Sequence, residues 1–146
     1  MICLIQRVTR ARVLVDGEVV GAIDAGLLAF VGLEQEDGDP QVERMADRLL
    51  GYRVFADAEG RMNRSLGDTG GGLLLVSQFT LAADTRSGLR PGFSAAAPPE
   101  VAEPGFNRLV ARCRERHAGR VETGRFGAHM DVELVNDGPV TFLLRA

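Results

Sequence analysis

Two stretches of the chain place hydrogen-bonding residues where they could do chemistry. The first begins as the apolar run 73–76 and ends in Ser77-Gln78-Phe79-Thr80. Four apolar residues after a glycine triplet are typical of a strand buried on both faces. The polar groups at its end must find partners in the protein or face a ligand, because unpaired buried polar groups are costly. This stretch alone leaves both interpretations open.

The second stretch is Asn136-Asp137-Gly138-Pro139, where a proline directly after a glycine interrupts two strand-like runs. A trans proline in a hairpin turn is the ordinary interpretation, since only about 5–6% of X-Pro bonds are cis. A cis bond in a tight turn would instead hold two neighbouring carbonyl groups side by side, aimed outward. Such a pair could read the amino group and the α-carbon geometry of a ligand without any side chain.

The usual catalytic side-chain sets are missing from the sequence. A nucleophilic Ser77 or Thr80 would need a base within hydrogen-bond reach. The chain has two histidines: His117 is expected on the surface near a helix end, and His129 lies in a turn-like segment. Neither spacing favours a triad, and the glycine triplet precedes a strand rather than a helix, so it is no phosphate cradle. An enzyme built on this chain must use its backbone or its substrate for much of the work.

Length and charge restrict the partners. The 146 residues suit one domain, residues 1–146, with one sizeable core. The net charge is −3, and all seventeen basic residues are arginine. This balance argues against tight binding along a nucleic-acid backbone, so no DNA partner is expected. It leaves open the binding of an RNA end, where few phosphates are touched.

Targeting signals and metal-ligand patterns are also lacking. No apolar run approaches the roughly 20 residues needed to cross a membrane, and the start of the chain does not resemble a signal peptide. We therefore expect a cytoplasmic protein with no membrane partner. Cys3 and Cys113 are expected to be free, buried and inert. Histidine and cysteine together supply only four scattered candidate ligands, so we expect neither a metal nor a cofactor.

The elements that must position the two stretches are mostly strands. Asp16-Gly17 between apolar runs predicts a hairpin near the start. A helix is predicted from Asp39, as its cap, to Gly51, and a second from about residue 99 to 118, whose regular part could begin only after Pro104. The runs 121–126, 130–135 and 140–144 predict strands, with 136–139 as a turn. We expect an α+β fold in which antiparallel sheets form a barrel-like core and two main helices pack outside.

The two stretches together resemble the D-aminoacyl-tRNA deacylase family, also called the D-tyrosyl-tRNA deacylase family. The likeness covers nearly the whole chain, and its two main motifs at their separation are specific. The matching segments are Gln6-Arg7-Val8, Leu50-Gly51-Tyr52-Arg53-Val54-Phe55, Ser77-Gln78-Phe79-Thr80 with Leu81-Ala82-Ala83-Asp84, Arg90-Pro91, Phe93-Ser94, Thr123-Gly124-Arg125-Phe126 and Asn136-Asp137-Gly138-Pro139-Val140-Thr141. The opening departs little from the family pattern, and the second helix departs more, at Pro98 and Pro104-Gly105.

The resemblance implies a homodimeric hydrolase that removes D-amino acids from tRNA, and also glycine mischarged on tRNA-Ala. It implies a cis Gly138-Pro139 peptide that enters the partner's pocket and leaves no room for an L side chain. Residues 77–80 would form that pocket and act on the 3′ end of the aminoacyl-tRNA. Arg7 would hold the Gly-Pro loop, and Phe126 would border the terminal adenosine.

The resemblance offers two accounts of the hydrolysis. In one, Thr80 is the nucleophile. In the other, the main-chain N–H groups of Phe79 and Thr80 hold the substrate while its own ribose hydroxyl activates water. The second is favoured here because Thr80 has no evident base. Three other interpretations remain: a relative with a trans Gly-Pro that edits a small L-amino acid, a non-catalytic RNA-end-binding barrel, and a structural dimer module.

Overall fold

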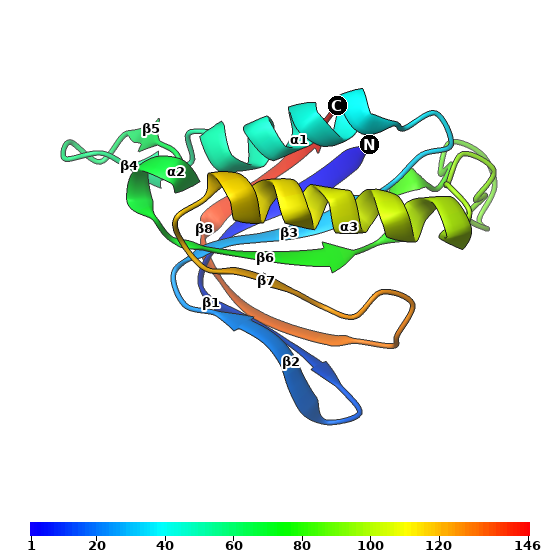
Figure 1. Cartoon of the computed structure of the whole chain (residues 1–146), viewed down its shortest axis with the longest axis horizontal. Coiled ribbons are helices and arrows are strands. Elements are labelled where there is room, and N and C mark those ends of the chain that lie inside the picture. The colour runs from blue at the N-terminus through cyan, green and yellow to red at the C-terminus, as the bar shows by residue number, and fades with distance from the viewer.

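The computed structural model describes all residues, Met1–Ala146. Six strands form one sheet, and two long helices lie side by side across one of its faces (Figure 1). The elements in chain order are β1 (Ile2–Val15), β2 (Glu18–Ile23), β3 (Gly26–Gly32), α1 (Asp39–Gly51), β4 (Phe55–Ala56), β5 (Met62–Arg64), α2 (Leu66–Thr69), β6 (Gly72–Ser77), the 3₁₀ helix η1 (Phe79–Ala82), α3 (Pro99–Arg116), β7 (Val121–Thr123) and β8 (Asp131–Arg145).

Strand β1 organises the sheet because it is long enough to serve three partners. Its first half pairs with β3, its second half pairs with β2, and β8 follows its other edge along nearly the whole length. The predicted hairpin is confirmed, since Asp16 and Gly17 both have positive φ. The sheet curls until β2 approaches β7, where a Cβ at Gly21 would collide with the carbonyl group of Thr123. The barrel-like core is therefore confirmed.

The sheet is mixed rather than purely antiparallel, which differs from the expectation. β6 lies between β3 and β7 and is parallel to both. Parallel neighbours need a crossover connection, usually through a helix. The chain supplies one through α1 between β3 and β6, and another through α3 between β6 and β7. The strands were recognised from the sequence, but their relative directions follow from these crossovers.

The helices cover the larger of two apolar clusters. The predicted apolar face of α1 is confirmed, and its buried residues are Val42, Met45, Ala46, Leu49 and Leu50. Its start differs from the prediction: Gly38 is the N-cap, and Asp39 and Pro40 are the first helical residues. α3 begins at Pro99 and contains Pro104, so the alternative of a start after Pro104 is wrong. Neither helix is long and apolar enough to cross a membrane.

The segment around Gly138 is not a chain-reversing turn. Strand β8 runs antiparallel to β1 on both sides of it, so the chain keeps its direction. Val8 lies opposite Asn136 and Gln6 lies opposite Thr141, so residues 137–140 face Arg7 alone. Extra residues on one strand form a bulge that leaves the ladder. The sequence indicated the interruption correctly but not that one continuous strand carries it.

Candidate functional site

The end of β6 presents unpaired backbone donors. Ser77 pairs with Val31 of β3, and the Gln78 N–H donates to the Val31 carbonyl at 2.7 Å. The chain then bends into η1, whose first bond runs from the Leu81 N–H to the Gln78 carbonyl at 3.2 Å. The N–H groups of Phe79 and Thr80 precede this bond and are therefore outside the helical pattern. We call residues 77–80 the strand-end segment.

The side chains of the strand-end segment lie on the surface. Phe79 is 57% exposed, and its ring contacts that of Phe93 with centroids 5.1 Å apart. The Gln78 side-chain amide donates to Thr80 Oγ1 at 2.6 Å. An amide of this kind orients a hydroxyl group but cannot accept its proton. Sequence reasoning gave Phe93 no role in the site, although it belongs to one of the matched motifs.

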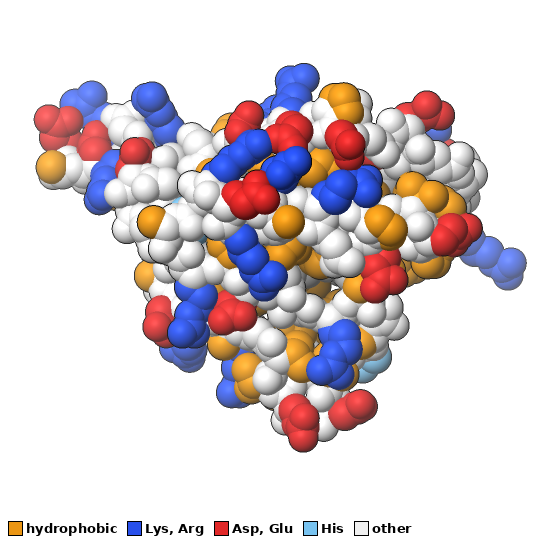
Figure 2. Space-filling view, in the orientation of Figure 1, with side chains coloured by type: hydrophobic (Ala, Val, Ile, Leu, Met, Phe, Trp, Pro, Cys, Tyr) orange, Lys and Arg blue, Asp and Glu red, His pale blue; other side chains and the backbone are white.

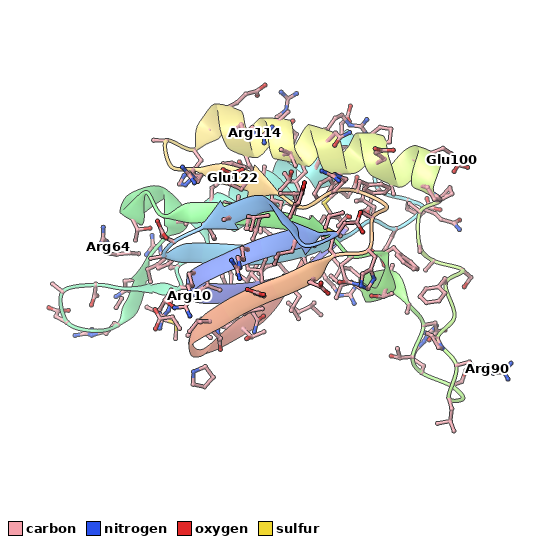
Figure 3. All side chains as sticks on the ribbon, turned by 90° about the horizontal axis from the view of Figure 1, so that it is seen from below. Arg10, Arg64, Arg90, Glu100, Arg114 and Glu122 are labelled. Carbon is pink, nitrogen blue, oxygen red and sulfur yellow. The ribbon has the colours of Figure 1, made fainter.

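A loop continues from the strand-end segment toward α3. Asp84 and Gly92 exchange backbone hydrogen bonds at its base, and Arg90 lies near its far tip (Figure 3). Arg86 donates to the Asp84 carboxylate at 2.8 and 2.9 Å and holds its pKa well below the usual range. Asp84 therefore stays charged and paired, and it is a poor candidate for a base.

Neither histidine lies near Thr80. The prediction of a surface His117 is wrong: the side chain is buried, with Nε2 2.7 Å from the carbonyl oxygen of Gly71. Gly71 immediately precedes β6, while Thr80 follows its end. The five steps of that strand span about 16 Å at about 3.3 Å per residue. His129 is 93% exposed beside Asp131. Thr80 has no imidazole to activate it.

The Gly138-Pro139 bulge is exposed and held by side chains from outside it. The Gly138–Pro139 peptide bond is cis. Arg7 contacts the neighbouring Asp137 twice, with Nε 3.0 Å from its carbonyl oxygen and 3.1 Å from its carboxylate, and donates through Nη1 to the Val54 carbonyl at 2.7 Å. Asn136 donates to the carbonyl groups of Arg7 and Val140, at 2.9 and 3.2 Å.

The bulge and the strand-end segment lie level with opposite ends of β6. The bulge begins beside Val8 of β1. Val8 pairs with Gly26 of β3, and Gly26 pairs with Gly72, the first residue of β6, so the bulge is level with the start of β6. The strand-end segment follows the last residue of β6, about 16 Å further along at about 3.3 Å per residue. Within one chain, the two groups of predicted site residues are therefore not brought together.

The remaining predicted residues divide between these two ends. Arg7 lies with the bulge. Phe126 lies at the other end, because the Gly124 N–H donates to the Leu75 carbonyl and the chain continues past the end of β6. The Phe126 ring packs against that of Phe106 with centroids 6.2 Å apart. No three His, Cys, Asp or Glu side chains lie close enough to share a metal ion.

The two cysteines lie in the core and away from both ends of the site. Cys3 and Cys113 are free and fully buried, as predicted. Burial raises the pKa of the Cys113 thiol to about 12 and raises that of Cys3 further. Because the thiolate is the reactive form, neither residue is a nucleophile in the folded protein.

Known proteins match the chain over its whole length. A family model described as D-Tyr-tRNA(Tyr) deacylase matches residues 4–145. A D-aminoacyl-tRNA deacylase of Xanthomonas campestris pv. campestris (strain 8004) is 72% identical over 145 residues, which are 99% of each chain. One of Stenotrophomonas maltophilia (strain K279a) is 73% identical over the same length and shares.

Solved structures give the same picture of the fold. A structure described as a c-Myc DNA unwinding element binding protein superposes with a TM-score of 0.96 at 38% identity, covering 100% of this chain and 99% of that one. A probable eukaryotic D-amino acid tRNA deacylase gives a TM-score of 0.86 at 16% identity, covering 99% and 98%. At 16% identity the second likeness concerns the fold alone.

Proposed function

The chain belongs to the D-Tyr-tRNA(Tyr) deacylase family, and on that basis we propose that it hydrolyses D-aminoacyl-tRNA. Water attacks the ester carbonyl, the bond from that carbon to the ribose oxygen breaks, and free D-amino acid and tRNA leave. Glycine mischarged on tRNA-Ala is proposed as a second substrate, since glycine also lacks an L side chain. The proposed compartment is the cytoplasm. The net charge of −3 argues against binding along a DNA backbone and is compatible with contact to a tRNA end only.

The proposed site is shared between two copies of the chain. The observation that carries this proposal is the separation of the strand-end segment and the Gly138-Pro139 bulge at opposite ends of β6. If both act on one substrate, the bulge must come from a second subunit. In this homodimer the Gly-Pro carbonyl groups of one subunit would fill the space that an L side chain needs. Arg7 would fix the bulge in that position.

Hydrolysis is proposed to rely on the backbone and the substrate. The N–H groups of Phe79 and Thr80 are the candidate hydrogen-bond donors to the carbonyl oxygen of the ester, where negative charge develops during the attack. The free hydroxyl group of the terminal ribose would activate the attacking water. The environment of Thr80 supports this substrate-assisted route, because its hydroxyl group accepts a hydrogen bond from the Gln78 side-chain amide and has no base beside it. Ser77 ends the strand, and Phe126 would border the terminal adenosine.

The activity is tested by incubating the protein with D-tyrosyl-tRNA or L-tyrosyl-tRNA, with a chelator present. We expect rapid hydrolysis of the D ester alone. Hydrolysis of neither ester with retained binding would replace the proposal by a non-catalytic RNA-end binder. Hydrolysis of both would contradict the proposed exclusion of L side chains.

The shared site is tested separately by mixing two defective variants. Phe79→Pro removes one candidate donor at a first helical position, where proline fits, and Phe79→Ala is its control because it keeps the N–H. Gly138→Ala alters the bulge. A mixed dimer of Phe79→Pro and Gly138→Ala chains contains one intact site only if the site is shared between subunits. Recovered activity on mixing supports the arrangement, and no recovery contradicts it.

A further inference from the structure

A groove of about 640 Å³ separates α3 from the chain that follows β7. Its helical wall is a single face of α3, with residues spaced three or four apart. These residues are Glu103, Phe106, Asn107, Val110, Ala111, Arg114 and Glu115. At about 1.5 Å per residue this face is about 18 Å long, so the groove is elongated. In Figure 2 the surface is hollowed beneath α3, with apolar side chains visible inside the hollow.

One end of the groove opens beside the strand-end segment. α3 and β7 are consecutive and run in opposite directions, so the segment after β7 returns toward the first turns of α3. The contact between Phe106 and Phe126 marks this end, next to the end of β6. The opposite end lies at Arg114, near the last turn of α3 and near β7 (Figure 3). The groove therefore leads away from the proposed catalytic end.

The arginines that line this groove are free to bind an anion. Neither Arg114 nor Arg125 has a carboxylate within 4.0 Å, unlike Arg108, Arg112 and Arg116 on the same helix. The lining residue Glu115 is already paired, because Arg112 donates to it at 2.9 Å. Glu103 is the one lining carboxylate without an arginine partner, and it lies at the Phe106 end. Arg114 thus places positive charge at the far end of the groove, while Arg125 directly precedes Phe126 at the aromatic end.

We propose that this groove binds the nucleotides that precede the terminal adenosine of the substrate, with Arg114 and Arg125 contacting their phosphates. The proposal rests on the proposed deacylase function, which places the 3′ end of a tRNA at the strand-end segment. That end is single-stranded, and single strands are held by basic residues along the backbone and by aromatic or polar groups at the bases. Planar guanidinium groups suit phosphate oxygens. Asn107 and Glu103 can bond to base edges, a carboxylate accepting from an exocyclic amino group.

The test compares two substrates with and without the upstream phosphates. D-tyrosyl-tRNA contains them, whereas the aminoacylated nucleoside D-tyrosyl-adenosine does not. For Arg114→Ala with Arg125→Ala, we expect KM for D-tyrosyl-tRNA to rise about tenfold, with kcat unchanged. Hydrolysis of D-tyrosyl-adenosine should match the wild type. The slope of log affinity for uncharged tRNA against log salt should decrease by about 1.4, which is about 0.7 for each lost single-strand phosphate contact.

Arg44→Ala is the matched control. Arg44 is exposed on α1, has no carboxylate partner and lies outside the groove. The proposal is overturned if the double variant behaves like Arg44→Ala, or if its KM rises equally for both substrates, which would mean a general disturbance of the site. Failure of the deacylase function itself is distinguishable, because the wild-type protein would then hydrolyse neither substrate.

Discussion

The bulge and the strand-end segment are held in opposite ways. Two side chains hold the bulge in place. Arg7 of β1 donates to the carbonyl groups of Asp137 and Val54. Asn136 donates to the carbonyl groups of Arg7 and Val140. Apart from the pairing of the Ser77 and Gln78 backbone with Val31 of β3, the strand-end segment is held by the hydrogen bond from the Gln78 side chain to Thr80. Two of its backbone N–H groups precede the first bond of η1.

This difference matches the roles proposed for the two regions. A group that excludes a side chain by its shape must not yield, and several side-chain bonds keep it in place. A group that stabilises charge must instead keep its donors unbonded until the substrate arrives. Changes to the bulge should therefore act through shape, and changes to the strand-end segment through lost donors. Substitutions in the two regions can separate these effects, beginning with the largest one expected.

Gly138→Ala should cause the largest loss. A Cβ at this position would collide with the backbone nitrogen of Val140, so the bulge must shift. Because a displacement of about 1 Å can cost about a hundredfold in rate, we expect kcat/KM for D-tyrosyl-tRNA to fall by about that factor. Single-turnover hydrolysis measures the effect. Gly51→Ala is the control, because no atom lies within 4 Å of a Cβ there. Equal activity of the two variants would show that the shape of the bulge is unimportant.

Arg7→Ala should act in the same way but less severely. The substitution removes the contacts to Asp137 and Val54 while leaving the bulge sequence intact. Losing a charged hydrogen bond costs about 1.5–3 kcal/mol, and Arg7 is partly accessible to solvent, so we expect a loss of about tenfold. The ratio of L-tyrosyl-tRNA to D-tyrosyl-tRNA hydrolysis should rise as the bulge loosens. Arg12 lies on the same strand as Arg7 and forms an exposed ion pair with Glu133 of β8, so Arg12→Ala is the control and should leave that ratio unchanged.

Thr80→Ala should have a small effect, since the backbone N–H remains. We expect kcat to stay within about fivefold of the wild type, because a positioned side-chain hydroxyl contributes about one neutral hydrogen bond. Measurement of kcat and of tRNA affinity separates chemistry from binding. Loss of all hydrolysis with unchanged affinity would restore Thr80 as the nucleophile and would move the chemistry from backbone to side chain.

Sequence reasoning succeeded where the local pattern decides the structure. The apolar spacing of α1 and the Asp16-Gly17 hairpin could be recognised because helix faces and tight turns depend on neighbouring residues. The strand-end segment was likewise visible as a buried run that becomes polar. The family could be identified for the same reason, since each of its two main motifs is a continuous run of residues.

Other features depend on contacts between distant residues and could not be predicted in this way. His117 looked like a surface residue because its neighbours are charged, yet its partner Gly71 is 46 positions away in the sequence. The continuity of β8 through Pro139 depends on pairing with β1, at the other end of the chain. The groove beside α3 was not anticipated, because it forms only when Arg114 and Phe126 come to lie on facing walls.

The smallest expected effect concerns the core between the two regions. Burial raises the pKa of both thiols, that of Cys113 to about 12, whereas an unfolded thiol has a pKa of about 8.5. The unfolded chain therefore loses thiol protons that the folded chain keeps, so the free energy of unfolding should fall as pH rises above about 8.5. At a pH of about 8.5, alkylation of Cys3 and Cys113 should be slow without denaturant and fast with it.

The same alkylation measurement shows whether the bulge variants lose activity through a local change of shape or through a weakened core. Asp137, Gly138 and Pro139 are exposed, and within the bulge only Val140 joins the core, so Gly138→Ala and Arg7→Ala should leave both cysteines as protected as in the wild type. Protection combined with lost activity means that a local change of shape is responsible. Rapid labelling of either variant would instead mean that the bulge supports the core, because the thiols become reactive only when the sheet separates from α3. The side-chain contacts that hold the bulge would then serve the stability of the fold rather than the rejection of L-aminoacyl-tRNA.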